Sequence, residues 1–275
     1  MMTDDLSARL PHGLVLLGCG KMGGAMLEGW LAGGLAPSAV TVIDPNPSDR
    51  LKALAAEGLT LNPAALPRAS VCLLAVKPQM MEEAAPQVAA LAAGGTLYLS
   101  VAAGTPIRTF ERMFGPVPII RAMPNTPAAV GRGITALIGN AHASETHMET
   151  AEALLAAIGV TVRLETEGQI DAVTGVSGSG PAYVFHMIEA MAAAGVAQGL
   201  SADLAMQLAR ATVCGAGELA FQSPESAAQL RINVTSPNGT TAAALAVLMK
   251  EGEGLTELMT RGVAAAADRS RELAG

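Results

Sequence analysis

The chain has few charged residues and few lysines. Charged side chains make up 15% of its 275 residues, the net charge is -7, and only four lysines are present. No segment gathers basic side chains, which excludes the basic face that nucleic-acid phosphates require. Hydrophobic residues amount to 51%, so polar residues are too few to cover the surface. We therefore expect some apolar surface to be buried against a partner subunit.

The chain also lacks an unbroken apolar segment long enough to cross a membrane. The longest stretch without charge runs from 84 to 107. Pro86, Gly94 and Pro106 help to divide it into a helix, a strand and turns. The opening MMTDDLSARLPHG begins with acids and contains no apolar core. We therefore expect neither a membrane span nor a signal peptide.

Disulfide and metal-binding patterns are absent as well. The three cysteines, Cys19, Cys72 and Cys214, are odd in number and lie far apart in apolar segments. This spacing is typical of reduced, buried thiols in a cytosolic protein. The four histidines are equally scattered and form no zinc-ligand pattern. The sequence thus predicts a cytoplasmic protein with no bound metal.

Short β-rich runs alternate with helical segments in the first part of the chain. The clearest strands are LVLLG, VTVID, VCLLAV, TLYLSV and VPIIRA. Further strands are expected at 133–138 and 160–164, and helices at 22–32, 48–57, 80–93 and 144–157. Near-continuous apolar strands separated by helices are typical of a parallel sheet covered on both faces.

After about residue 169 the alternation stops, and only helices are expected. They are predicted at 181–198, 201–221, 226–232, 240–251 and 254–273. The sequence therefore predicts an α/β protein with an N-terminal Rossmann-type domain at 13–166. That domain contains a doubly wound, mostly parallel sheet, and an all-helical domain follows it at 167–275.

The segment GCGKMGG follows the first predicted strand and places Gly18, Gly20 and Gly23 in G-x-G-x-x-G spacing. A helix follows, and Asp44 ends the next strand, where a dinucleotide fold places the acid that binds the adenosine ribose. The glycines let backbone N–H groups approach the pyrophosphate at a helix N-terminus. The alternative is a turn that is merely tightly packed. In this context the motif predicts a dinucleotide site, with Lys21 and Met22 in the same loop.

Two further strand ends are expected at the same edge of the sheet. The first is AVKPQ, in which Lys77 is alternatively a solvated charge. The second is VAAGT, whose small residues would let a flat ring approach. The loop RAMPNTP, 121–127, is expected to line a cleft between the domains. The candidate cofactor-binding residues at the two strand ends are Ala75, Val76, Lys77, Pro78, Ala102, Ala103 and Gly104.

The choice between NADH and NADPH is left open by the sequence. Asp44 favours NAD, because a carboxylate accepts from the 2′-OH and repels a 2′-phosphate. The loop PNPSDR offers Asn46, Ser48 and Arg50, which are able to hold that phosphate. Asn46 and Arg50 are therefore candidate cofactor-binding residues beside Asp44.

Two motifs distinguish the helical part. VSGSGP, 176–181, predicts a tight turn or hinge with Pro181 at a helix start. TSPNGTT, 235–241, crowds hydroxyl groups before the apolar run AAALAVLM. Thr240 or Thr241 lies where that helix starts, so free N–H groups and the positive end of the dipole face the loop. One hydroxyl suffices for a helix cap, the alternative reading, so the crowding favours a bound carboxylate.

With SPNGTT, GSGPAY, MPNTP and AVKP in this order, the chain resembles the pyrroline-5-carboxylate reductase family from about Leu14 to the last helix. The resemblance implies reduction of the C=N bond of 1-pyrroline-5-carboxylate to L-proline by NADPH or NADH, the last step of proline biosynthesis. It implies a substrate carboxylate on the N–H groups of Gly239, Thr240 and Thr241, near Ser236. Thr241 would bond the ring nitrogen, so Thr241 and Ser236 are the candidate catalytic residues.

The resemblance also implies the surroundings of this loop. Glu167 would lie near the substrate nitrogen, and Asn233 would face the cofactor. The helical domain would interlock two subunits into a homodimer, and five such dimers would form a decamer in some members. The family usually has two glycines in the loop, and Asn238 replaces the first. Asn tolerates a left-handed backbone better than other non-Gly residues, so the turn is expected to survive.

Three alternative functions remain. Another two-domain dehydrogenase, of the β-hydroxyacid or 6-phosphogluconate type, would need a Lys in the second domain as its acid–base catalyst. No Lys occurs between Lys77 and Lys250, which disfavours that type. A reductase that acts on a related cyclic imine carboxylate remains an alternative, because the sequence does not reveal the size of the substrate pocket. A non-catalytic NAD(P) sensor would leave SPNGTT without a purpose.

Overall fold

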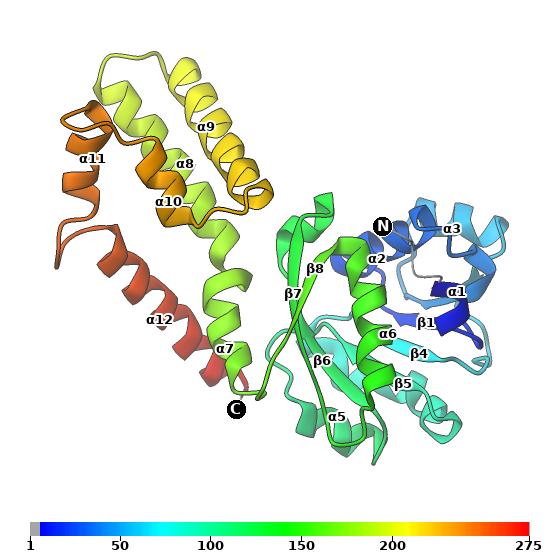
Figure 1. The fold of residues 1–275 in the computed structure, drawn as a ribbon. Helices are drawn as coiled ribbons and strands as arrows, with labels where there is room; N and C mark the ends of the chain where they lie inside the picture. The colour runs from blue at the N-terminus through cyan, green and yellow to red at the C-terminus, as the bar shows by residue number, and fades with distance from the viewer. Residues whose placement is uncertain (1–5, 275) are drawn as a thin grey trace. The chain divides into compact units, whose positions relative to one another are not determined.

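The computed structural model describes residues 6–274, which form two compact units (Figure 1). Unit 1 extends to Gly178 and includes the end of the last helix from Ala267; unit 2 is Ser179–Ala266. Residues 1–5 of the acidic N-terminal segment, and residue 275 at the end of the predicted second domain, lie outside the described part. Across the described helices, none has the length and apolar character needed to cross a membrane.

An eight-stranded sheet forms the framework of unit 1. Its order is β3-β2-β1-β4-β5-β6-β7-β8. All neighbouring strands are parallel except β6 and β7. The order of the first six strands is that of the Rossmann fold, which confirms the predicted α/β class. The strands are β1 Leu14–Leu17, β2 Val40–Ile43, β3 Thr60–Leu61, β4 Val71–Leu74, β5 Leu97–Ser100, β6 Ile119–Met123, β7 Gly133–Gly139 and β8 Gly159–Arg163.

Helical segments connect these strands, and those at 6–9, 107–114 and 169–173 were not predicted. The segment expected as a single helix at 80–93 is mostly 3₁₀-helical from Ala85 onward. The ring of Pro86 would clash with the carbonyl group of residue 82 in a continuous α-helix, so α4 ends before it. The α-helices of unit 1 are α1 Leu6–Arg9, α2 Lys21–Ala32, α3 Asp49–Ala56, α4 Met81–Ala84, α5 Ile107–Phe114, α6 Glu145–Leu155 and α7 Gln169–Val173. The 3₁₀ segments are η1 Pro37–Ala39, η2 Pro78–Met80, η3 Ala85–Gly94, η4 Thr126–Val130 and η5 Ala156–Ile158, and η6 Thr174–Gly178 is a π-helix.

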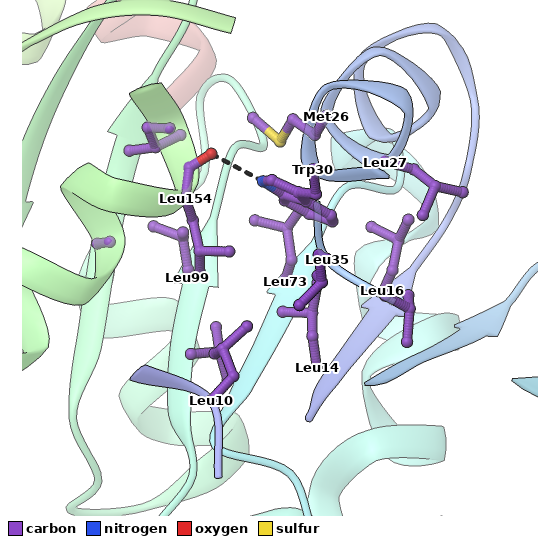
Figure 2. Packing of buried hydrophobic residues seen from close by; sticks show 14 of the residues in the cluster. Leu10, Leu14, Leu16, Met26, Leu27, Trp30, Leu35, Leu73, Leu99 and Leu154 are labelled. Carbon is purple, nitrogen blue, oxygen red and sulfur yellow. Dashed lines mark hydrogen bonds between the residues drawn. The ribbon is translucent and has the colours of Figure 1, made fainter. Parts of the chain in front are cut away.

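Two apolar clusters cover the two faces of the sheet. Alternate β1 residues belong to different clusters, Leu14 and Leu16 to one and Val15 and Leu17 to the other. In the first cluster the fully buried Trp30 of α2 donates its indole N–H to the carbonyl oxygen of Leu154 at 2.8 Å (Figure 2). This bond joins α2 to α6, so the helix that starts at the glycine motif is held firmly against the sheet.

Helix α6 begins with a capping box in which a histidine takes the usual place of Glu or Gln. The Ser144 hydroxyl accepts from the His147 N–H at 3.3 Å, and His147 Nδ1 accepts from the Ser144 N–H at 3.1 Å. Burial lowers the pKa of His147. Protonation of Nδ1 would remove its acceptor lone pair and break the box.

We therefore expect His147 to make the protein less stable as the pH falls below about 6.5, the pKa of His in an unfolded chain. The unfolded state then binds a proton that the folded state resists, so the free energy of unfolding decreases. His147→Gln should keep the box without titrating, and should retain more of its stability than the wild type between pH 7.5 and 5.5. Urea unfolding at each pH measures this, and parallel curves for the two proteins would contradict it.

Unit 2 is helical throughout its elements but has little buried core. Its buried cluster consists of Ala192 of α8 with Ala205 and Ala209 of α9. Most of the exposed large apolar side chains of the described residues lie in this unit, among them Phe185 and Phe221. The helices are α8 Gly180–Ala197, α9 Ala202–Gln222, α10 Ala227–Asn233, α11 Thr240–Leu248 and α12 Leu255–Ala274, whose end belongs to unit 1.

Candidate functional site

The loop between β1 and α2 requires glycine at its first position and leaves open space at its second. Gly18 has φ +86°, and a Cβ there would lie 2.7 Å from Val76 Cγ1 and 3.0 Å from the Val76 nitrogen. A Cβ on Gly23 would collide with the Gly18 carbonyl oxygen. A Cβ on Gly20 would meet no heavy atom within 4 Å. The loop is therefore packed on its inner side and open on its outer side.

This arrangement fits a dinucleotide pyrophosphate. Gly20 is the N-cap residue of α2, and no side chain caps that helix. The N–H groups of the first turn of the helix, which includes Lys21 and Met22, lie beside the open space at Gly20. Free helix N–H groups and the positive end of the helix dipole bind phosphate oxygens. The residues present thus suit the cofactor that the glycine spacing predicts.

Asp44 follows β2 and is held by the backbone around it. Its Oδ2 accepts from the Cys19 N–H at 2.8 Å, and its Oδ1 accepts from the Asn46 N–H at 2.8 Å. The Asn62 side chain binds the Asp44 backbone at both its N–H and its carbonyl group. Asn62 Oδ1 accepts from the Asp44 N–H at 2.9 Å, and Asn62 Nδ2 donates to the Asp44 carbonyl oxygen at 2.8 Å. Burial, with help from Asp44 and Glu28, raises the pKa of the Cys19 thiol to about 11. The Asp44 carboxylate is therefore fixed at the glycine loop.

The sequence reasoning missed Asn62. It lies just after β3 with φ +46°, a value that is uncommon for a non-Gly residue and is tolerated best by Asn and Asp. An Asn after a two-residue strand gives a weak signal in the sequence, and its contact with Asp44 bridges 18 residues.

The basic and hydroxyl groups of the PNPSDR loop have partners within unit 1. Arg50 donates to both carboxylate oxygens of Glu28, at 2.8 and 3.1 Å, and lies 3.8 Å from Glu57. The hydrogen bond from Arg50 lowers the pKa of Glu28. The Ser48 hydroxyl accepts from the Leu51 N–H and so caps α3. Asn46 contributes its N–H to Asp44.

The other predicted strand ends lie at the same edge of the sheet. Strands β2, β1, β4 and β5 are parallel neighbours, so the residues that follow them share the carboxyl edge. Residues 75–78 follow β4, and the Ala75 N–H donates to the Leu17 carbonyl oxygen at 2.8 Å. Residues 102–104 follow β5, and Gly104 has φ +73°. Within unit 1 the structure therefore gathers the predicted cofactor residues along one edge.

Glu167 lies between β8 and α7 and is joined to a buried arginine. Its Oε1 accepts from Arg121 Nη1 at 2.7 Å and from the Ile107 N–H at 2.8 Å. The Arg121 side chain is 6% exposed and that of Glu167 is 32% exposed. Ile107 opens α5, immediately after the loop that contains 102–104. Glu167 thus anchors that loop to β6, a role that the sequence did not predict.

The VSGSGP segment is not the tight turn that we expected. Residues 174–178 form a π-helix between α7 and α8, so helical structure runs on through the motif. Asn125, in the MPNTP loop, donates to the Ser177 carbonyl oxygen at 3.2 Å and accepts from the Ile134 N–H at 3.0 Å. Pro181 lies in the first turn of α8, as predicted. π-Helical turns are rare and occur often at functional sites.

In unit 2 the TSPNGTT segment leads into α11, which begins at Thr240. Gly239 is the N-cap residue, and no side chain caps this helix. In residues 6–274, the hydroxyls of Ser236, Thr240 and Thr241 make no hydrogen bond, whereas that of Thr235 donates to the Arg231 carbonyl oxygen at 2.6 Å. The prediction that the helix starts at Thr240 or Thr241 is confirmed. Ordinary capping does not account for the crowded hydroxyls.

The replacement of glycine by Asn238 is accommodated as expected, because Asn238 has φ +58°. A Cβ on Gly239 would require the Ser236 hydroxyl to move. We expect Asn238→Ala to lower the free energy of unfolding by about 1 kcal/mol, the approximate strain of a left-handed residue. Asn238→Gly should leave it within about 0.5 kcal/mol of the wild type. Urea unfolding of the three proteins measures this, and equal stability of the Ala and Gly variants would contradict it.

Asn233, at the end of α10, has both ends of its amide engaged. Its Nδ2 donates to Glu225 Oε2 at 2.9 Å, and its Oδ1 accepts from Gln229 Nε2 at 2.8 Å. These bonds orient the side chain within unit 2. The predicted site residues thus fall into two sets, those from Gly18 to Glu167 in unit 1 and those from Asn233 to Thr241 in unit 2.

Comparison with known families assigns both parts of the chain. The model described as pyrroline-5-carboxylate reductase dimerisation matches residues 167–273. The model described as NADP oxidoreductase coenzyme F420-dependent matches residues 14–104. The first covers all of unit 2, and the second covers the strands that end at the dinucleotide edge.

Individual relatives match over nearly the whole chain. The pyrroline-5-carboxylate reductase of Pseudomonas aeruginosa is 39% identical over 265 residues, which cover 95% of this chain and 96% of the relative. The solved pyrroline-5-carboxylate reductase of Coxiella burnetii has a TM-score of 0.89 at 32% identity, over 96% of this chain and 99% of that one. That of Plasmodium falciparum, solved with NADP bound, has a TM-score of 0.77 at 26% identity, over 96% and 98%.

Proposed function

Because the chain belongs to the pyrroline-5-carboxylate reductase family, we propose that it reduces 1-pyrroline-5-carboxylate to L-proline with NADH or NADPH, the last step of proline biosynthesis. It is an NAD(P)H-dependent oxidoreductase that acts on a C=N bond. The observation that carries the proposal is the uncapped start of α11, beside which the hydroxyls of Ser236, Thr240 and Thr241 make no hydrogen bond within residues 6–274. Such a place suits the carboxylate of a small substrate.

The residues of unit 1 would hold the cofactor. The first turn of α2 and the open space at Gly20 suit the pyrophosphate, and Asp44 suits the adenosine ribose. Residues 75–78 and 102–104 would border the rest of the dinucleotide, and Asn233 would face it from unit 2. When bound, the reduced nicotinamide supplies the hydride that the C=N carbon accepts.

The residues of unit 2 would hold the substrate. Its carboxylate would accept from the N–H groups of Gly239, Thr240 and Thr241, with Ser236 beside it. The Thr241 hydroxyl would bond the ring nitrogen and stabilise the developing amine, and Glu167 would lie on the nitrogen side. A protonated cyclic imine is already electrophilic, so alignment rather than a strong base is what the protein must supply.

The chain self-associates through its helical unit. Unit 2 buries a cluster of small alanines and exposes many large apolar side chains, a composition that needs a partner to cover it. We propose a homodimer that contributes residues of both subunits to each site, and five such dimers in a decamer. The three cysteines are free thiols, which suits a reducing compartment, and we propose the cytoplasm.

The decisive experiment follows nicotinamide absorbance while purified protein is incubated with 1-pyrroline-5-carboxylate, in parallel with NADH and NADPH. Loss of absorbance with stoichiometric appearance of proline would support the proposal. Turnover of a six-membered cyclic imine carboxylate but not of the pyrroline would favour the related reductase. Cofactor binding with no turnover on either imine would favour a sensor.

Thr241→Ala tests the proposed catalytic role. We expect kcat to fall about 100-fold, because the hydroxyl that holds the nitrogen is lost, while the cofactor Kd changes less than threefold. Thr235→Ala is the matched control, since the hydroxyl of Thr235 is used within the helical unit by the Arg231 carbonyl oxygen. Equal losses of turnover and of cofactor affinity in Thr241→Ala would contradict the role.

A further inference from the structure

We infer that this chain prefers NADH to NADPH, and that Asp44 is the residue that discriminates between them. The two cofactors differ in one group, the phosphate on the adenosine 2′ position. The inference rests on the proposed function to the extent that the β1–α2 loop binds a dinucleotide. It goes further by assigning the cofactor from the charges around the end of β2.

The Asp44 carboxylate is held in one position by backbone hydrogen bonds. Both of its oxygens accept backbone N–H groups, one from Cys19 in the glycine loop and one from Asn46. The Asn62 amide holds the Asp44 backbone on both sides. The carboxylate therefore cannot turn away without losing two hydrogen bonds. Each oxygen keeps a further lone pair, so the group remains able to accept from a ribose hydroxyl.

Acidic side chains outnumber basic ones around the Asp44 carboxylate. Asp44 and Glu28 both act on the Cys19 thiol, so these two acids lie around the same point of the loop. Arg50, the predicted phosphate ligand, is bonded to Glu28 and lies near Glu57. Lys52 is paired with Asp49 at 2.9 Å. Four acids thus outnumber two bases, and an added phosphate dianion would meet a net negative field.

The serine hydroxyl of the PNPSDR loop and the start of α3 already have partners in the chain. The Ser48 hydroxyl already caps α3, and Asp49 stands in the first turn of that helix. The Asp49 carboxylate therefore already offsets the positive end of the α3 dipole, which weakens its attraction for a phosphate. No free hydroxyl or uncapped N–H cluster replaces Ser48 among the described residues of the PNPSDR loop.

Three other cations of unit 1 lie close in sequence to β1 or β4. Lys21 stands at the start of α2, in the pyrophosphate loop, where it would act on both dinucleotides alike. Lys77 follows β4. Strand β1 lies between β4 and β2, so β4 and β2 are about 10 Å apart. Arg68 precedes β4, and it lines one cavity of about 390 Å³ with His12 and Leu14 at the amino ends of the strands. It also lines a second cavity, of about 860 Å³, with Pro45 and Asn62. Neither lysine therefore offsets Asp44 selectively.

Binding without turnover tests the inference directly. Isothermal titration would give the Kd of AMP and of adenosine 2′,5′-bisphosphate, two probes that lack the nicotinamide and differ in the 2′-phosphate. We expect AMP to bind at least tenfold more tightly, and NADH to show the same advantage over NADPH. Raising the salt from 50 to 500 mM should shrink the disadvantage of the bisphosphate, because salt screens repulsion between exposed charges.

Variants assign the effect to Asp44. Asp44→Ser should narrow the NADH advantage at least fivefold, whereas Asp49→Asn, which removes a fully exposed acid from the same loop, should alter it less than twofold. Glu28→Gln should release Arg50 and improve NADPH binding. Where Asp44→Ser loosens the loop, thermal unfolding detects it, and the wild-type salt series still decides the question.

The outcomes separate this inference from the proposed function. Equal or tighter binding of adenosine 2′,5′-bisphosphate, or a cofactor ratio that Asp44→Ser and Asp49→Asn alter alike, overturns the inference. A preference for AMP without turnover of any pyrroline substrate supports the inference and contradicts the proposed reductase. Turnover with NADPH as the better cofactor supports the reductase and overturns the inference.

Discussion

Glu167→Ala is expected to lower the free energy of unfolding by about 3 kcal/mol, because it leaves a buried guanidinium without its carboxylate. The Arg121 side chain is 6% exposed, and Glu167 is its ion-pair partner at 2.7 Å in the described structure. The substitution also takes the acceptor from the Ile107 N–H at the start of α5. The loop of 102–104 should therefore loosen, and cofactor affinity should fall with stability. Urea unfolding and cofactor titration of the same sample measure both effects.

A surface ion pair of the same length provides the control. Glu145 accepts from Arg163 at 2.6 Å, and both side chains are well exposed. Glu145→Ala should cost less than about 1 kcal/mol, since exposed pairs contribute little. The double variant Arg121→Met with Glu167→Gln should recover much of the loss seen in Glu167→Ala, because it removes the buried charge together with its partner. Similar losses in Glu145→Ala and Glu167→Ala would contradict this account.

The sheet was predictable because its pattern is local. Each of β1, β4 and β5 is a mostly apolar run buried at every position, and the parallel pairing follows from the helices between them. The two-residue β3 was not predicted, because two residues carry no periodicity. The 3₁₀ character around Pro86 was also missed. There the apolar spacing fitted a helix, and the ring of Pro86 interrupts a continuous α-helix.

The two sets of site residues were predictable from motifs, but the side-chain pairs that hold them in place were not. The glycine spacing and the crowded hydroxyls of TSPNGTT are short contiguous motifs in the sequence. The bond between Arg121 and Glu167 spans 46 residues, and that between Arg50 and Glu28 spans 22. A single sequence contains no signal for such pairs, since any of many acids would serve equally well. Only the folded structure determines which acid pairs with each arginine.

Gly18→Ala should destabilise the protein by about 3 kcal/mol, the second large effect we expect. Its φ of +86° strains any residue with a Cβ, which contributes about 1–2 kcal/mol. The added Cβ would lie 2.7 Å from Val76 Cγ1 and 3.0 Å from the Val76 backbone nitrogen. Relief of that contact requires the β1 and β4 ends to move apart, and overpacking of this kind adds about 1–3 kcal/mol.

Gly20→Ala, two residues along, should behave in the opposite way and thereby locate the cofactor. Its φ is -72° and its Cβ would meet open space, so we expect a loss of stability of about 0.5 kcal/mol or less. That same open space is where a pyrophosphate would approach the first turn of α2, so the Kd of NADH should rise about tenfold or more. Thermal unfolding and cofactor titration of both variants give a crossed pattern, with Gly18→Ala losing stability and Gly20→Ala losing affinity. If the cofactor affinity of Gly20→Ala were unchanged, the dinucleotide would have to bind elsewhere. A pyrophosphate at the start of α2 would occupy the open space into which the added Cβ projects.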